Sequence, residues 1–212
     1  MSIAEEEVDV EARRSDVHRA PAAPRITVPP EQHYPWYVRV ILALQRRKYG
    51  AEFESARVWG LLPRSFLMLS MLYRTLDRAG SPIEAGLRAL VQVRISQINW
   101  CAFCIDANGA VALERSVAPE KLAALGAFEE SPLFSEAEKA ALAYAEAMTD
   151  SARGVDDALF VRLRRHFGER EILELTALAA FQNLSSKFNA ALGVPAQGFC
   201  AQGGAAPARG SK

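Results

Sequence analysis

The chain has 212 residues, half of them apolar, so it can bury a sizeable core and is not a disordered protein. Its 25 lysines and arginines balance 25 aspartates and glutamates, which excludes a nucleic acid or an anionic membrane held by bulk charge and leaves a small molecule or a protein as partner. No apolar run approaches the roughly 20 residues that span a bilayer, and the acidic start is unlike a secretory signal, so we expect a cytoplasmic protein.

The predicted elements are helices. Residues 1–33 are rich in proline and acidic side chains and are predicted to form a mobile or loosely attached arm. From residue 34 the apolar residues recur with helical period, which predicts one all-α domain over 34–202, followed by a disordered tail over 203–212. Helices are expected at 35–49, 63–78, 82–98, 102–115, 119–126, 136–148, 157–168 and 170–192.

Capping residues mark several of these boundaries. Ser81 is the expected N-cap of one helix, with Pro82 at its first position and Glu84 three residues after the cap. Ser135 begins another, again with a glutamate three residues later, and Asp156 or Asp157 begins a third. The helix boundaries are therefore predicted from local sequence.

The final helix carries polar residues within an apolar pattern. These are Gln182, Asn183, Ser185, Ser186, Lys187 and Asn189. We expect the helix to break near Gln182 and Asn183, where the apolar period weakens. The polar side chains either line a pocket near the cysteines or supply hydrogen bonds between helices or subunits.

Cys101 and Cys104 form a C-x-x-C motif. This spacing places both sulfurs within disulfide range when the first cysteine begins a helix and the second lies in its first turn. The expected boundaries agree, since one helix stops near Ile98 and Asn99 can cap the next. Free N–H groups and the helix dipole favour thiolate there, and such pairs have thiol pKa values of about 3.5–7.5. The motif therefore predicts a reactive dithiol.

Two other interpretations of the pair stay open. In the first, the cysteines are buried as small apolar side chains. A zinc site would need two further ligands, and the available residues are in no paired arrangement: Cys200, His166, His33 and His18. Cys200 itself, after Phe199, is interpreted as a packing residue.

The sequence around the pair resembles a known family. The run of residues 90–106, LVQVRISQINWCAFCID, is similar to the carboxymuconolactone decarboxylase family, in particular its alkylhydroperoxidase D-like branch. The stretch from Phe134 through Val194 to Cys200 is similar too, so the likeness covers most of residues 37–200. It implies an all-helical alkylhydroperoxidase D-like bundle, with the C-x-x-C at a helix N-terminus, that assembles as a homo-oligomer: a dimer, trimer or hexamer.

The resemblance also implies roles for the two cysteines. In a peroxiredoxin-type, antioxidant reaction, Cys104 attacks the peroxide and Cys101 resolves the sulfenic acid as a disulfide, which a thiol or dithiol partner reduces. No cofactor or metal is implied. Two positions depart from the family's proton relay, however, because its glutamate and histidine are replaced by Ala89 and Asn108. General acid–base help is worth about 10²–10⁴ in rate, so a weakened or altered relay is expected.

Three residues near the pair are candidates for a supporting role. Asn108 takes the place of the relay histidine, and Arg94 could lower a thiol pKa as a fixed cation, or else lie exposed or at an interface. Asp106 is the nearest carboxylate, but two residues after Cys104 it points away from that cysteine's face of the helix.

Three functions follow as hypotheses. The first is a thiol-dependent peroxidase or disulfide oxidoreductase that acts on a small peroxide or disulfide. The second is a non-catalytic oligomeric scaffold or redox-responsive binding module that keeps the fold and the pair. The third is a decarboxylase-like acid–base enzyme, whose activity would survive loss of both cysteines; the C-x-x-C counts against it, because family members with that chemistry generally lack the paired cysteines.

Overall fold

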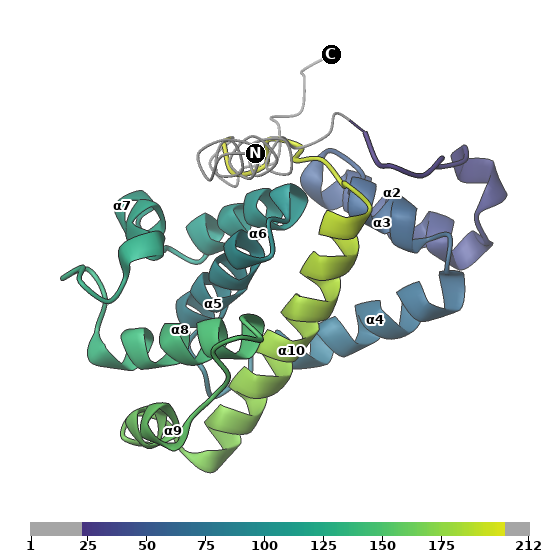
Figure 1. Cartoon of the computed structure of the whole chain (residues 1–212). Helices are drawn as coiled ribbons and strands as arrows, with labels where there is room; N and C mark the ends of the chain where they lie inside the picture. Colours follow the sequence, from purple (N-terminus) through teal and green to yellow (C-terminus); the bar gives the residue numbers. More distant parts are fainter. Residues whose placement is uncertain (1–22, 202–212) are drawn as a thin grey trace, which may run out of the picture.

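The fold is a bundle of helices, seen in a computed structural model that describes residues 23–201 (Figure 1). The elements are η1 (Glu31–His33), α2 (Trp36–Tyr49), α3 (Glu54–Trp59), α4 (Pro63–Leu76), α5 (Ala85–Ile98), α6 (Ala102–Glu114), α7 (Pro119–Ala123), η2 (Ala124–Ala127), α8 (Glu136–Thr149), α9 (Asp157–Arg164) and α10 (Glu169–Ala191). Since this region holds helices and no strand, the predicted all-α class is confirmed. Among the same residues, no helix is long and apolar enough to cross a bilayer.

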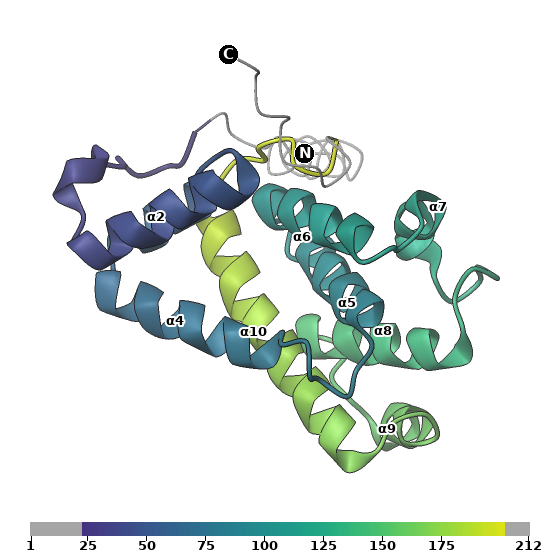
Figure 2. The same ribbon diagram turned by 180° about the vertical axis from the view of Figure 1, so that it is seen from behind.

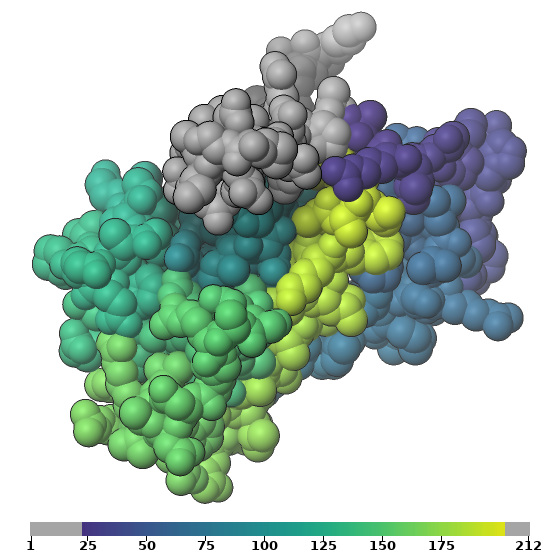
Figure 3. Space-filling view, viewed as in Figure 1, coloured from purple at the N-terminus to yellow at the C-terminus, as the bar shows by residue number. Residues whose placement is uncertain are grey.

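Helix α10 organises the bundle. It contacts α5, α6, α8 and α9 on one side and α4 on the other. Figures 1 and 2 show α2 and α4 on one side of α10, with α8 and α9 on the opposite side. In the space-filling view, the C-terminal segment runs between the blue N-terminal helices and the green ones (Figure 3). The middle of the chain, α5 and α6, is thereby enclosed.

The main core lies between α5, α8 and α10. Helix α5 is buried on most of its surface, and Leu90, Ile95, Leu142 and Leu175 are at most 1% exposed. Burying a leucine or isoleucine contributes about 1.5–3 kcal/mol. This core holds α5 in place, and α5 in turn delivers the chain to the cysteine pair at its C-terminal end.

Two of the predicted caps are confirmed and one is wrong. Ser135 and Glu138 form a capping box at the start of α8, and Asp156 caps α9. Ser81 does not cap α5: its hydroxyl donates to Glu174, and the helix begins three residues later than expected. Glu84 is the N-cap instead, because its carboxylate accepts the N–H groups of the first turn.

Three further features of the helices differ from the predictions. Helix α3 was not expected, because six residues are too short to show a helical period. Helix α9 ends at Arg164, since Gly168 becomes the N-cap of α10. Helix α10 does not break near Gln182 and Asn183, because both side chains find hydrogen-bond partners on neighbouring helices.

Part of the expected arm packs against the domain. The backbone N–H of Arg25 donates to the carbonyl of Leu192 (2.8 Å), and its guanidinium donates to that of Ala191 (3.1 Å). Val28 packs against the apolar side chains of α2, α3 and the site region. Residues 23–33 are thus attached to the bundle, whereas the predictions for 1–22 and for the tail lie outside the described residues.

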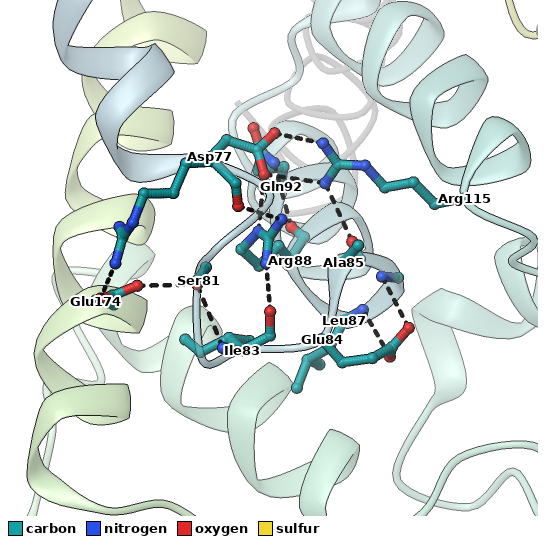
Figure 4. Close-up of polar contacts among 12 residues, drawn as sticks. Asp77, Ser81, Ile83, Glu84, Ala85, Leu87, Arg88, Gln92, Arg115 and Glu174 are labelled. Carbon is teal, nitrogen blue, oxygen red and sulfur yellow. Dashed lines mark hydrogen bonds and ion pairs between the residues drawn. The ribbon is translucent and has the colours of Figure 1, made fainter.

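A buried ionic cluster joins the ends of α4, α5 and α6 (Figure 4). The carboxylate of Asp77 accepts from Arg88 (2.8 Å), Arg115 (2.7 Å) and the hydroxyl of Tyr73 (2.9 Å). Other N–H groups of Arg88 donate to two backbone carbonyls. Burial alone would raise the pKa of Asp77, but the bonds from the two arginines outweigh it and hold that pKa below its ordinary value. With its charges paired, the cluster is a structural support.

Candidate redox site

A tight turn between α5 and α6 places the cysteine pair. Trp100 has a φ of 54°, in the left-handed region, and its N–H donates to the carbonyl of Gln97 (3.1 Å). The N–H of Cys101 donates to the carbonyl of Ser96 (3.0 Å). These two bonds make a Schellman motif at the end of α5, usually built with a glycine at the left-handed position. The turn ends α5 and makes Cys101, rather than Asn99, the N-cap of α6.

The two sulfurs are joined in a disulfide at the start of α6. The Cα atoms of Cys101 and Cys104 lie 5.2 Å apart, and the N–H of Cys104 donates to Sγ of Cys101 (3.2 Å). The predicted placement of both residues, one at the cap and one in the first turn, is confirmed. In residues 23–201, no group of three or more histidine, cysteine, aspartate or glutamate side chains lies close enough together to hold a metal ion.

A cavity of about 590 Å³ adjoins Cys104. Its walls come from α2, α3, α4, α6 and α10, and they are mostly apolar and aromatic, including Phe53, Trp59 and Phe103. Cys104 belongs to the cavity wall, whereas Cys101 is fully buried behind it. A molecule in the cavity would therefore reach Cys104 before Cys101.

Asn189 provides the polar contact of the Cys104 sulfur. Its side-chain N–H donates to Sγ of Cys104 (3.5 Å), and its carbonyl oxygen accepts from the hydroxyl of Ser55 (2.9 Å). All three residues are buried. An N–H donor beside a sulfur favours thiolate over thiol and lowers the thiol pKa. The sequence placed Asn189 in a polar cluster without a partner, and Ser55 was missed together with α3.

The relay positions hold no proton-transfer group. Ala89 is fully buried in the main core. Asn108 lines the cavity, but its amide donates to the hydroxyl of Ser96 (3.2 Å), not to a cysteine. The same hydroxyl accepts from Gln182 (2.9 Å), so α5, α6 and α10 are tied together at this point. The polar residues of α10 thus serve both predicted roles, since Gln182 lines the cavity and bonds between helices.

The other candidate residues are engaged elsewhere. Arg94 donates to Glu146 (2.6 Å) and Gln97 (3.1 Å), so its charge is neutralised by a carboxylate. The expectation that Arg94 acts as a cation on the cysteines is therefore wrong. Asp106 points away from Cys104, as expected, and its carboxylate accepts the backbone N–H groups of Gln197 and Cys200, both at 2.8 Å.

Cys200 is a packing residue at the end of the described chain. An atom at the Cβ position of Gly109 would lie 2.9 Å from Sγ of Cys200, so a larger residue at position 109 would force the Cys200 side chain to shift. Burial raises the pKa of the Cys200 thiol, and the neighbouring Asp106 raises it further. A thiol held protonated is a poor nucleophile, which sets Cys200 apart from the C-x-x-C pair.

The fold and the site together define an all-helical protein with a C-x-x-C disulfide at a helix N-terminus. A model of the carboxymuconolactone decarboxylase family matches residues 66–147. The uncharacterised protein YnjA of Escherichia coli (strain K12) is 42% identical over 173 residues, which cover 82% of this chain and 95% of YnjA. The chain therefore belongs to the carboxymuconolactone decarboxylase family, and the resemblance seen in residues 90–106 is confirmed.

Solved structures share the fold. The alkylhydroperoxidase AhpD core of a peroxidase-related protein from Ralstonia eutropha JMP134 superposes with a TM-score of 0.78 and 21% identity, covering 89% of this chain and all of that one. The debrominase Bmp8 superposes with a TM-score of 0.70 and 22% identity, covering 80% of this chain and 90% of that one. The alkylhydroperoxidase D-like fold expected from the sequence is thus confirmed.

Proposed function

We propose that the protein is a thiol-dependent peroxidase or disulfide oxidoreductase in which Cys104 is the nucleophile and Cys101 resolves. The observation that carries this proposal is the position of Cys104: bonded to Cys101 at the start of α6 and forming part of the wall of a large cavity. Membership of a family whose fold is shared by peroxidase-related proteins supports it.

The reaction runs in three steps that balance. The Cys104 thiolate attacks one peroxide oxygen, the O–O bond breaks, and the other oxygen leaves as an alcohol or water after taking up a proton. The thiol of Cys101 then attacks the Cys104 sulfenic acid, forming the disulfide and releasing water. A thiol reductant or a dithiol protein supplies two electrons and two protons to restore both thiols. A disulfide substrate would enter by the same thiol exchange.

Activation of the thiol differs from the glutamate–histidine relay. Ala89 and Asn108 cannot transfer a proton in the physiological range. The amide of Asn189, itself held by Ser55, instead stabilises the thiolate without taking its proton. The proton passes to solvent or to the departing oxygen. We expect the reaction to be slower than one assisted by the relay, by a factor of up to about 10²–10⁴, which is the rate enhancement that general acid–base catalysis gives.

Mild oxidation of the reduced protein tests the proposal. Treatment with hydrogen peroxide or cumene hydroperoxide should remove two hydrogen atoms from the intact mass, and supply of a dithiol should give turnover in excess of protein. Cys104→Ser should abolish both results, whereas Cys200→Ser, the matched control, should leave them unchanged because that thiol lies outside the cavity wall.

Other results would point to the other two hypotheses. Persistence of both free thiols under conditions that oxidise ordinary dithiols contradicts the redox proposal. Disulfide formation without turnover, tested against several thiol donors, favours the redox-responsive binding module. Conversion of a lactone acid that survives Cys101→Ser and Cys104→Ser together favours the decarboxylase-like enzyme.

We propose in addition that the chain forms the homo-oligomer implied by its family resemblance. Large apolar side chains on α2 and α4 are exposed in the single chain: Val40, Leu44, Met68, Met71 and Leu72. Exposed large apolar side chains on two helices support a protein contact there, because apolar surface of this kind marks interaction sites. Light scattering after gel filtration measures the assembly directly, and a monomeric mass would contradict this part of the proposal.

A further inference from the structure

The cavity beside Cys104 is much larger than a peroxide group needs. At about 590 Å³ it falls within the roughly 300–1,000 Å³ that pockets for organic ligands enclose. Aromatic side chains from five helices and from the residue before α3 form much of its wall: Tyr49, Phe53, Trp59, Phe66, Phe103 and Phe181. Such a wall stabilises a ring or hydrocarbon body by burying it from water and by ring contacts.

One polar atom on this wall has no partner. Gln92 is 1% exposed and belongs to the cavity lining, and its Oε1 forms no hydrogen bond in the described part of the chain. The amide orientation is fixed, because Nε2 donates to the carbonyl of Arg88 (3.3 Å) and a carbonyl can only accept. Leaving a buried acceptor unpaired is unfavourable, because the oxygen has lost its hydrogen bonds to water. Gln92 therefore offers an unfilled acceptor.

Four polar side chains of the cavity wall, in contrast, use their donors within the protein. The hydroxyl of Ser70 donates to the carbonyl of Phe66 (2.7 Å), and that of Tyr73 donates to Asp77 (2.9 Å). The amides of Asn108 and Gln182 donate to Ser96. A ligand that pairs with Oε1 of Gln92 must bring its own O–H or N–H group, because this oxygen can only accept.

We propose that the cavity binds an uncharged, mostly apolar aromatic compound carrying one hydroxyl or N–H group, which donates to Oε1 of Gln92. Gln92 is then a specificity-determining residue. The proposal deepens the proposed function, since it gives a substrate class for the cavity that Cys104 lines. The binding itself requires no redox step, so it can be measured separately.

A matched pair of probes tests the hydrogen bond. The full-length protein, kept in its disulfide form, is titrated calorimetrically with 2-naphthol and with 2-methoxynaphthalene, which lacks the donor. We expect the native protein to bind 2-naphthol about tenfold more tightly, as one hydrogen bond to a buried acceptor allows. In Gln92→Leu this preference should disappear, while in Ser70→Ala, a control on the same wall, it should remain.

The outcomes separate this inference from the proposed function. Equal binding of the two probes, binding of neither, or a preference that persists in Gln92→Leu would overturn the inference, whatever the turnover assay shows. Loss of turnover with an intact preference for 2-naphthol would overturn only the redox proposal. If Gln92→Leu fails to fold, as judged by circular dichroism, Gln92→Met keeps the side-chain length without the acceptor and takes its place.

Discussion

The two sides of α10 are packed in different ways. Toward α5 and α8 the core combines aliphatic side chains such as Leu90 and Ile95 with small ones, since α8 buries five alanines: Ala140, Ala141, Ala143, Ala145 and Ala147. Toward α2, α3 and α4 the contacts are made by bulky rings, such as Trp59 stacked on Phe188 with centroids 3.6 Å apart. Small side chains let helices approach closely, whereas the rings meet around a cavity. The side of α10 toward α5 and α8 is therefore closed, and the side toward α2, α3 and α4 is open, because it holds the cavity.

The match to the family model also separates the two sides of α10. The matched region, 66–147, contains the cysteine pair and the alanine-rich helix α8. It leaves out α2, α3 and the segment between them, which contribute Tyr49, Trp59 and Phe53 to the cavity. The cysteine pair thus lies in the part that the family model matches, while much of the cavity wall lies outside that part.

The largest expected effect concerns the cluster that joins the two sides. Asp77→Asn removes the negative charge between Arg88 and Arg115. Both guanidinium groups then lose the carboxylate with which they form ion pairs. Breaking a buried ion pair from one side typically lowers the free energy of unfolding by about 3–5 kcal/mol. Urea unfolding monitored by circular dichroism measures the loss. Glu174→Gln, at a more exposed ion pair with Arg78, is the control and should cost about 1 kcal/mol or less.

Replacing an alanine by a leucine should have different effects on the closed side and on the open side of α10. Ala145→Leu places extra methyl groups where the side chain is fully buried, and overpacking of this kind costs about 1–3 kcal/mol. Ala107→Leu adds the same atoms at the cavity wall, where there is room, and should change the free energy of unfolding by less than about 0.5 kcal/mol. Equal losses in the two variants would contradict the difference in packing.

A smaller effect is expected at the sulfur itself. Asn189→Leu removes the N–H donor beside Cys104 at similar volume, so the thiol pKa should rise and the reaction with peroxide should slow about tenfold near neutral pH. The pH profile of thiol alkylation reads the pKa directly. Asn183→Ala, on the same helix but bonded to Thr149, should leave that profile in place. An unchanged profile in Asn189→Leu would remove Asn189 from the site.

Acid should reveal the smallest of these effects. The two arginines hold the pKa of Asp77 below its ordinary value, which is about 3.9 in an unfolded chain. The stabilisation is therefore complete above that ordinary value and is lost as the pH falls through the folded value. Melting curves from pH 6 to pH 3 should show the gap between the native protein and Asp77→Asn narrowing toward low pH. A gap that widens in acid would contradict the assignment.

Sequence reasoning succeeded where the signal is local. The capping box of Ser135 and Glu138 and the helix start at Cys101 depend on groups a few residues apart, so both could be predicted. It failed for α3, which is too short to show the helical period of apolar residues. It also failed for Arg94, whose partner Glu146 lies 52 residues away. Nothing near Arg94 in the chain indicates that this carboxylate will neutralise it.

By itself, the sequence determined an all-helical chain and the placement of two cysteines at the start of one helix, because hydrogen bonds within a few residues decide both. Only the tertiary structure decided what surrounds Cys104. Asn189 reaches its sulfur from 85 residues away. Likewise, Gln92, whose side-chain oxygen is unpaired, lines the cavity together with residues of distant helices. These contacts depend on how whole helices pack, and packing is set by side-chain volumes across the entire core.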